Sequence, residues 1–260
     1  MPAEFEGKTA LITGSGRGIG ASIATGLARA GADVVLIARS SEQLEETADS
    51  IRTAVPGTNV RTVQVDLTDH ERRRVALHDV QSTAPVDILI NNAATVEPLG
   101  ATADITADAV RTAFEINVIV PFAVTSILVP RMVDAGWGRI VNISSSVAGN
   151  TTSMIGGNVY VSTKAALEAH SRNLAAELHA TGVTVNAYRP GGVDTDMQRW
   201  IRSQNPERIG AALRDRFAGR YEAGELISAQ ESAAHLLDHL TGADSEVTGA
   251  IWDLGDTVAP

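Results

Sequence analysis

The fold of this 260-residue chain is decided near its beginning, by Lys8-Thr-Ala-Leu-Ile-Thr13 and the following Gly14-Ser-Gly-Arg-Gly-Ile-Gly20. The first segment is a short apolar run that ends in glycines, which predicts a buried β-strand. Residues 21–30 then show the helical spacing of apolar residues. This order favours dinucleotide binding, because glycines let backbone N–H groups approach a pyrophosphate at the positive end of a helix. The alternative is a flexible glycine-rich turn.

The same alternation of strand and helix continues to the end of the chain. Further strands are predicted at residues 34–38, 60–65, 86–90, 138–143, 183–188 and 249–254. Helical patterns fill most of the intervals, and polar residues gather where the strands end. The pattern predicts an α/β fold of the Rossmann type. We expect one doubly wound parallel sheet of about seven strands, with helices on both faces, formed by residues 1–260 as a single domain.

Three helices have recognisable starts. The capping pairs are Ser40 with Gln43, Thr68 with Glu71, and Ser228 with Glu231. A longer, mostly helical region is expected at residues 106–135. Its most apolar part, residues 116–130, is interrupted by polar residues and proline, so we expect it to be too short and too polar to span a bilayer.

Composition argues against several classes of function. The net charge of −10 disfavours a nucleic-acid or anionic-membrane surface. The chain has no cysteine, which excludes disulfides and thiolate metal sites and fits the reducing cytoplasm, where we expect the protein to work. The N-terminus lacks the apolar region of a secretory signal. The six histidines offer only the i,i+4 pair His235 and His239, without the glutamate of a metalloprotease helix, so no metal site is expected.

Two strand ends carry candidate cofactor contacts. Arg39 ends the second strand, about twenty residues past the glycines, where an acidic residue would bind the ribose of NAD and an arginine suits the 2′-phosphate of NADP. Arg17 in the glycine loop would add a second positive charge, and solvated surface arginines are the alternative. Asp66 follows the third strand, where it can contact adenine or form a turn before the next helix.

Tyr160 and Lys164 form the candidate catalytic pair. Four residues apart, they fall on one face of a helix. A tyrosine has a pKa of about 10, and a fixed ammonium nearby is expected to lower that pKa toward neutrality, as proton transfer to a carbonyl requires. Because the spacing also occurs in solvated ion contacts, the pair alone is weak evidence. A serine cluster, Ser144 to Ser146, lies upstream at the predicted end of the fifth strand.

Together these motifs resemble the short-chain dehydrogenase/reductase family in its short single-domain subclass. The segment from Thr13 to Gly20 matches the family pattern Thr-Gly-x-x-x-Gly-x-Gly, and Asn91-Asn92-Ala93 matches Asn-Asn-Ala, although Ala94 replaces the usual glycine. Asn117, the serine cluster, Tyr160 and Lys164 match the family's Asn-Ser-Tyr-Lys set. Pro190-Gly191 with Thr195 matches the segment after the sixth strand. The match keeps motif order over nearly the whole chain.

The resemblance implies roles for these residues. It implies that NADP(H), with NAD(H) less favoured, exchanges a hydride with a carbonyl or alcohol substrate while Tyr160 transfers the proton. Lys164 would lower the Tyr160 pKa and hold the nicotinamide ribose, a serine would bind the carbonyl oxygen, and Asn117 would distort its helix and hold a water in a proton path. The implied cofactor contacts are Gly14, Ser15, Gly16, Arg17, Gly18, Ile19, Arg39, Asp66, Leu67, Asn92, Tyr160, Lys164, Pro190, Val193 and Thr195.

The serine cluster leaves one choice open. Counting from the end of the strand selects Ser145, and counting back from Tyr160 brings Ser146 nearer the family's usual interval. We favour Ser145, because the strand fixes where the side chain points.

The general pattern resembles the 3-oxoacyl-carrier-protein reductases most. An NAD-dependent alcohol or sugar dehydrogenase is the enzymatic alternative, and a catalytically silent dinucleotide-binding sensor or scaffold is the alternative of another class. Residues 194–223, polar and rich in arginine, are expected to form a substrate lid. The family resemblance suggests a homotetramer that packs through the helix after Lys164 and the long helix around Asn117.

Overall fold

A seven-stranded parallel sheet forms the centre of the molecule. The computed structural model describes residues 4–254. The strands are β1 (Thr9–Thr13), β2 (Asp33–Ala38), β3 (Val60–Gln64), β4 (Ile88–Asn91), β5 (Gly138–Ile143), β6 (Val183–Arg189) and β7 (Ile251–Asp253). Their spatial order is β3-β2-β1-β4-β5-β6-β7, and each neighbouring pair is parallel. The predicted fold class is confirmed, and the strand order reverses between β1 and β4, where a doubly wound sheet binds its ligand.

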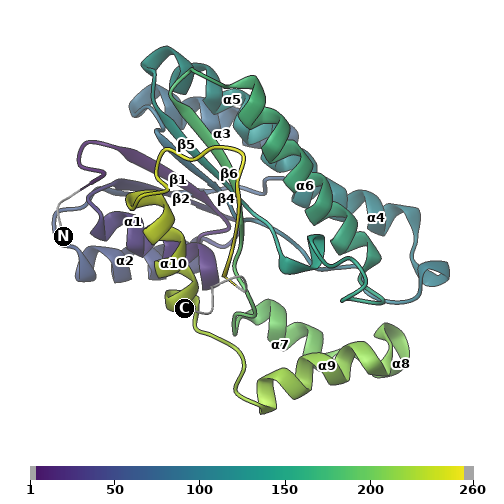
Figure 1. Cartoon of the computed structure of the whole chain (residues 1–260). Coiled ribbons are helices and arrows are strands. Elements are labelled where there is room, and N and C mark those ends of the chain that lie inside the picture. The colour runs from purple at the N-terminus through teal and green to yellow at the C-terminus, as the bar shows by residue number, and fades with distance from the viewer. Residues whose placement is uncertain (1–3, 255–260) are drawn as a thin grey trace.

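Helices cover both faces of the sheet (Figure 1). They are α1 (Gly18–Arg29), α2 (Ser41–Ala54), α3 (His70–Thr83), α4 (Ala107–Phe114), α5 (Val120–Ala135), α6 (Asn158–Glu177), α7 (Asp196–Ser203), α8 (Pro206–Ile209), α9 (Ala211–Glu222) and α10 (Ala229–Thr241). Short 3-10 turns η1 (Thr102–Asp104) and η3 (Ser146–Ala148) and a π-helical turn η2 (Glu115–Ile119) complete the elements. Of the predicted caps, Ser40 and Ser228 are confirmed. Thr68 is not a cap: Asp69 caps α3, and Thr68 bonds Asp66 instead.

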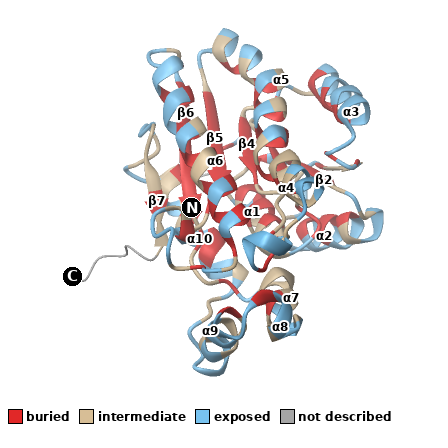
Figure 2. Cartoon of the chain, turned by 90° about the vertical axis from the view of Figure 1, so that its right-hand side faces the viewer, coloured by how far each residue is buried: buried red, intermediate tan, exposed pale blue. Residues whose placement is uncertain are grey.

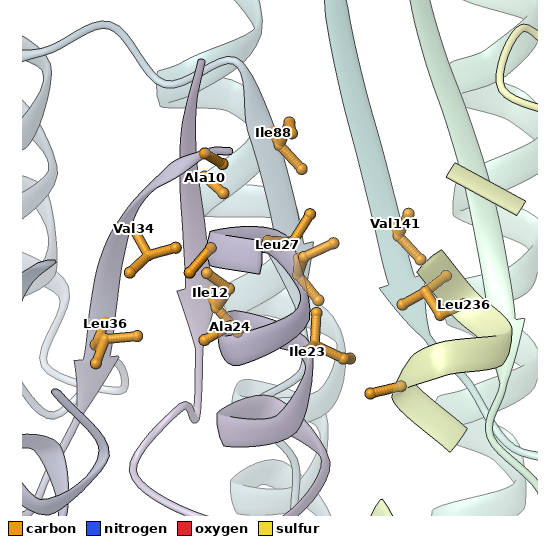
Figure 3. Close-up of a cluster of buried hydrophobic side chains, with 14 of the residues drawn as sticks. Ala10, Ile12, Ile23, Ala24, Leu27, Val34, Leu36, Ile88, Val141 and Leu236 are labelled. Carbon is orange, nitrogen blue, oxygen red and sulfur yellow. The ribbon is translucent and has the colours of Figure 1, made fainter. Parts of the chain in front are cut away.

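Alternating side chains of the strands fill two cores. In β1, Ala10 and Ile12 face the helices α1, α2 and α10, whereas Leu11 faces the opposite side. Figure 3 shows the first core, where residues of β1, β2, β4 and β5 meet Ile23 and Leu27 of α1. A strand that is buried on both faces needs a continuous run of apolar residues, and such runs are the pattern from which the strands were predicted.

The region from residue 106 to 135 is one long helix. By length and composition, the helix Ala107–Ala135 (29 residues) is apolar enough to cross a membrane, so the expectation that it is too short and too polar is wrong. Part of the apolar character has another explanation, because Val124, Leu128 and Met132 are buried in the second core. Ile119 and Phe122 on the same helix are about half exposed.

The helices α7, α8 and α9 project from the body below the carboxyl ends of the strands (Figures 1 and 2). The backbone pins the base of this segment: Ile227 N–H donates to Gly192 O at 3.0 Å, and Asp194 N–H donates to Ile227 O at 2.9 Å. Its inner face joins a third apolar cluster, in which Ile201, Ile209 and Leu213 pack with Tyr160 and Met154. The α7–α9 segment therefore lies over the region that the candidate catalytic residues share.

Candidate active site

A cleft of about 1680 Å³ opens at the carboxyl ends of the strands. Nearly all of the predicted site residues line it: Gly14, Gly16, Arg17, Gly18, Ile19, Arg39, Asp66, Leu67, Asn92, Ser145, Tyr160, Lys164, Pro190, Val193 and Thr195. Ser15 is an exception. It is fully buried, and its hydroxyl is directed at the Ile37 carbonyl, so it supports the glycine loop from below instead of facing the cleft.

The glycine loop is held against the strand β4 end. Gly14 has a φ of +65°, and a Cβ there would lie 2.9 Å from the Ala93 Cα, so only glycine fits. Asn92 explains the close approach, because its Nδ2 donates to Thr13 O at 2.9 Å and to Gly14 O at 3.0 Å. Asn92 thus lines the cleft while its amide nitrogen fixes the loop.

This loop fits a dinucleotide pyrophosphate. The residue before α1, Arg17, makes no side-chain hydrogen bond to the start of the helix, so its side chain does not occupy the backbone N–H groups of the first turn. Backbone N–H groups at the positive end of a helix bind phosphate. The close-packed glycines keep side chains out of the way.

Two arginines, Arg17 and Arg39, line the cleft beside the glycine loop and the end of β2. Arg39 is exposed at the end of β2, with no acidic residue beside it on the strand. Arg17 makes an ion pair with Asp196 of α7 at 2.9 Å, and Asp196 also pairs with Arg199. The hydrogen bond from the Thr68 backbone lowers the pKa of Asp66, with a smaller contribution from the charge of Arg39. Asp66 therefore forms the predicted turn and also lies on the cleft wall.

Tyr160 and Lys164 lie one turn apart on α6, as predicted, and both are buried. The Lys164 Nζ donates to the Ile143 carbonyl at 2.7 Å and lies 5.7 Å from the centroid of the Tyr160 ring. Burial raises the pKa of Tyr160 to about 12, and it lowers the pKa of Lys164 to about 8 against the attraction of Glu168. Desolvation is thus the main influence on the pKa of Tyr160 in this structure, and the lowering of that pKa by Lys164 stays a prediction.

The three serines have different surroundings. Ser144 is buried and donates to Glu168 Oε1 at 2.7 Å. Ser145 is half-buried on the cleft, and its hydrogen bond with Tyr160 acts to lower the pKa of that phenol. Ser146 is exposed and begins η3. Ser145 is thus the serine that the strand end directs to Tyr160.

Asn117 lies beside the cleft without lining it. It occupies the π-helical turn between α4 and α5, so the predicted distortion of its helix is present. Its Oδ1 accepts from Thr95 N at 2.8 Å, and its Nδ2 donates to Thr95 O at 2.8 Å and to Thr163 Oγ1 at 3.0 Å. The side-chain amide is used in these contacts, and the water in a proton path stays a prediction.

Sequence reasoning missed two groups near the site. Glu168 follows Lys164 by four residues, and Arg189 precedes Pro190; the two form a buried ion pair beside the serine cluster. A signal for Glu168 was present, because it follows Lys164 at the same i,i+4 spacing by which Lys164 follows Tyr160. Asp196 was placed in the lid, but its ion pair with Arg17 had no signal in the sequence.

Comparisons with known proteins agree with this geometry. Residues 8–206 match the family model of the short chain dehydrogenases. The chain is 31% identical to the 3-oxoacyl-(acyl-carrier-protein) reductase FabG of Aquifex aeolicus, over 97% of this chain and 100% of that one. It is 39% identical to the L-xylulose reductase of Mesocricetus auratus, over 76% of this chain and 77% of that one.

A solved structure is similar over its whole length. A variant of the actinorhodin polyketide ketoreductase, crystallised with NADPH, has a TM-score of 0.84 and 29% identity, over 98% of this chain and 97% of that one. The site, the family match and these relatives lead to one conclusion: the chain belongs to the short chain dehydrogenase family and is an oxidoreductase.

Proposed function

We propose that this protein uses NADP(H) to interconvert a carbonyl and a secondary alcohol. The observation that carries the proposal is the convergence of Tyr160, Lys164 and Ser145 with a phosphate-binding glycine loop in one cleft. The bound nicotinamide would supply or accept a hydride. Tyr160, Lys164 and Ser145 supply the proton and the hydrogen bonds that the substrate oxygen needs.

Tyr160 is assigned the proton transfer. Its neutral phenol is a donor in the direction of carbonyl reduction, and a pKa raised by burial keeps that proton in place until a substrate oxygen develops charge. Ser145 hydrogen-bonds the same oxygen, where negative charge develops in the transition state. Lys164 remains close to the phenol, fixed by the Ile143 carbonyl, and has donors left for a ribose hydroxyl.

The cofactor is proposed to be NADP(H) because of charge at the adenosine end. Arg39 and Arg17 both line the cleft, and no acid replaces Arg39 at the end of β2. Arginine binds phosphate through paired N–H donors. The polyketide ketoreductase that resembles this chain was crystallised with NADPH. Asp66, Leu67 and Asn92 would line the adenine and ribose, and Pro190, Val193 and Thr195 the carboxamide.

Replacing Arg39 by alanine is expected to weaken NADPH binding about 10- to 100-fold, because a hydrogen bond to a charged group is worth about 1.5–3 kcal/mol. NADH binding should change less than about twofold, since NADH has no 2′-phosphate. Calorimetric titration with each nucleotide measures both. Arg111→Ala, an exposed arginine on α4 that pairs with Asp108, is the matched control. A preference for NADPH that survives in Arg39→Ala would contradict the assignment.

The substrate end of the cleft combines apolar and basic residues. Val96, Val147, Met154, Trp200 and Phe217 line it, together with Arg208, Arg216 and Arg220 of the α8 and α9 helices. The acids Glu97, Asp194 and Asp196 also line the cleft; Asp194 pairs with Arg202 and Asp196 with Arg17. The lining suits an oxo compound with an apolar segment and an anionic group, and a 3-oxoacyl thioester is the finer proposal, supported by the resemblance to FabG. An NAD-dependent alcohol or sugar dehydrogenase is the second candidate, favoured by the 39% identity to L-xylulose reductase.

A panel of oxo acids, their methyl esters, 3-oxoacyl thioesters and ketoses separates these candidates when nicotinamide absorbance is followed. We expect the oxo acids to have KM values about tenfold or more below those of their neutral methyl esters, since a hydrogen bond to a charged group is worth about 1.5–3 kcal/mol and tenfold is about 1.4 kcal/mol. If the apolar lining selects an acyl chain, the 3-oxoacyl thioesters should have lower KM values than the ketoses. Ketoses with the lowest KM would favour the second candidate. Nucleotide binding without turnover of any compound would favour a silent sensor or scaffold.

Two further proposals concern the surroundings of the site. The α7–α9 segment is proposed to be a lid over the substrate, pinned at Val193 and Ile227. We also propose a cytoplasmic homotetramer that pairs α5 and α6 with those of a second copy. The half-exposed Phe122 on α5, which stacks on His170 of α6, supports that surface.

A further inference from the structure

A buried carboxylate lies directly behind the catalytic side chains. Glu168 is on α6, one turn beyond Lys164, and only 7% of it is exposed. Its Oε1 accepts from Ser144 Oγ at 2.7 Å and from Arg189 Nε at 2.8 Å, and its Oε2 accepts from Arg189 Nη2 at 2.9 Å. The carboxylate therefore joins the helix of Tyr160 to the end of β5 and the end of β6.

The network extends to β7, the edge strand of the sheet. Arg189 Nη1 donates to Asp253 Oδ2 of β7 at 3.1 Å. A Cβ on Gly149 would lie 2.5 Å from Arg189 Nη1, so the guanidinium packs directly against the backbone that follows the serine cluster. Ser144 is fixed a second time, because its N–H donates to Tyr188 O at 2.7 Å. The residue next to Ser145 is thus held from both its backbone and its side chain.

Such a network has to be explained, because buried ion pairs contribute little net stability. The desolvation of two charges often exceeds their attraction, and well-packed apolar side chains in the same place are often as stable. Lys164 gives a reason to keep the charge. Two titratable groups lie near its buried ammonium, Tyr160 and Glu168, and the phenol of Tyr160 bears no charge below pH 10. Glu168 in turn pairs with Arg189, and Arg189 pairs with Asp253.

We propose that Glu168 is a positioning residue: its carboxylate holds Ser144, and through it the Ser145 hydroxyl, and from one helical turn beyond Lys164 it presents a negative charge to that buried ammonium. The part of this inference that concerns the reaction rests on the proposed function. The part that concerns the charge of Lys164 does not.

The lysine content permits a direct test, because the chain has only two lysines, Lys8 and Lys164. With isotope-labelled lysine, NMR follows the two side-chain amines separately, and a Lys8→Arg variant assigns them. In the unmodified protein we expect Lys164 to titrate with a pKa of about 8. In Glu168→Gln the midpoint should fall by about one pH unit, since an opposite charge has been removed. The signal of Lys8, which pairs with Asp87, serves as the reference within the same sample.

The activity arm separates positioning from stability. In Glu168→Gln we expect kcat at pH 8 to fall about tenfold, KM to change less than about threefold, and the alkaline limit of the kcat profile to shift with the Lys164 midpoint. Ser144→Ala removes only the serine contact and should lower kcat without moving the Lys164 midpoint. Asp253→Asn removes the outer carboxylate and should lower thermal stability with an unchanged pH profile.

A fallback covers the case in which Glu168→Gln does not fold. The triple variant Glu168→Gln/Arg189→Met/Asp253→Asn removes the charges of both ion pairs that Arg189 makes, so that neither carboxylate is left without its guanidinium. Its Lys164 midpoint should also fall. The same Lys164 midpoint in every folded variant, together with kcat losses that follow stability alone, would overturn the inference. If the Lys164 midpoint falls but the protein shows no dehydrogenase activity, the effect of the Glu168 charge would be supported and the proposed function would be contradicted.

Discussion

A Tyr160→Phe variant is expected to lose about 10³-fold in kcat, while its fold and its affinity for NADPH remain. General acid–base catalysis contributes about 10²–10⁴-fold, and no other side chain that lines the cleft combines a phenol with contacts to Ser145 and Lys164. The ring packs in the apolar cluster with Met154 and Leu213, so phenylalanine fills the same space. Steady-state kinetics with the best compound of the panel measure the loss.

The control for this variant is Tyr221→Phe. Tyr221 lies on α9, about half exposed, with its ring against the Arg202 guanidinium, and it does not line the cleft. Its hydroxyl can be removed without touching the proton path, so activity should stay within about twofold. If Tyr160→Phe kept more than about a tenth of the activity, the assignment of the proton to Tyr160 would be wrong.

The second large effect is expected at Ser145. Loss of one donor to a developing oxyanion costs about 10²–10³-fold in kcat, and Ser145→Ala should show a loss of that size. Ser146→Ala is the matched control, because the two serines are adjacent, carry the same hydroxyl and both line the cleft. Ser146 is exposed at the start of η3, so its removal should cost less than about threefold. A larger loss in Ser146→Ala than in Ser145→Ala would reverse the choice between them.

The layered fold could be predicted because its signals are local. Strands buried on both faces require apolar runs, and the glycines at positions 14 and 20 are required where the turn touches Asn92. The errors were also local. Asp69, not Thr68, caps α3, because the Asp66 carboxylate captures the Thr68 hydroxyl and N–H. The sequence shows the two possible acceptors, the carboxylates of Asp66 and Asp69, but it does not show which backbone N–H group each of them binds.

The site was harder to predict where burial decides the outcome. Helical spacing placed Tyr160 beside Lys164, but it did not show that both side chains are desolvated, and desolvation sets the direction of both pKa values. The position of Ser15 also depends on packing: the motif names the residue, and only the structure shows that its side chain points at the Ile37 carbonyl. Glu168 and Arg189 are 21 residues apart, so their pairing depends on the neighbouring positions of α6 and β6.

The ion pair of Arg17 with Asp196 joins the glycine loop to the start of α7, so we expect nucleotide binding and substrate binding to be coupled through it, weakly because both side chains are largely exposed. A nucleotide phosphate that draws Arg17 away from Asp196 leaves the first helical turn of α7 with Arg199 as its partner, and so changes the energy of moving that helix. This coupling is reciprocal: if bound nucleotide changes the affinity for substrate by some factor through this helix, bound substrate changes the affinity for nucleotide by the same factor. We therefore expect that whichever molecule binds first changes the affinity of the protein for the second.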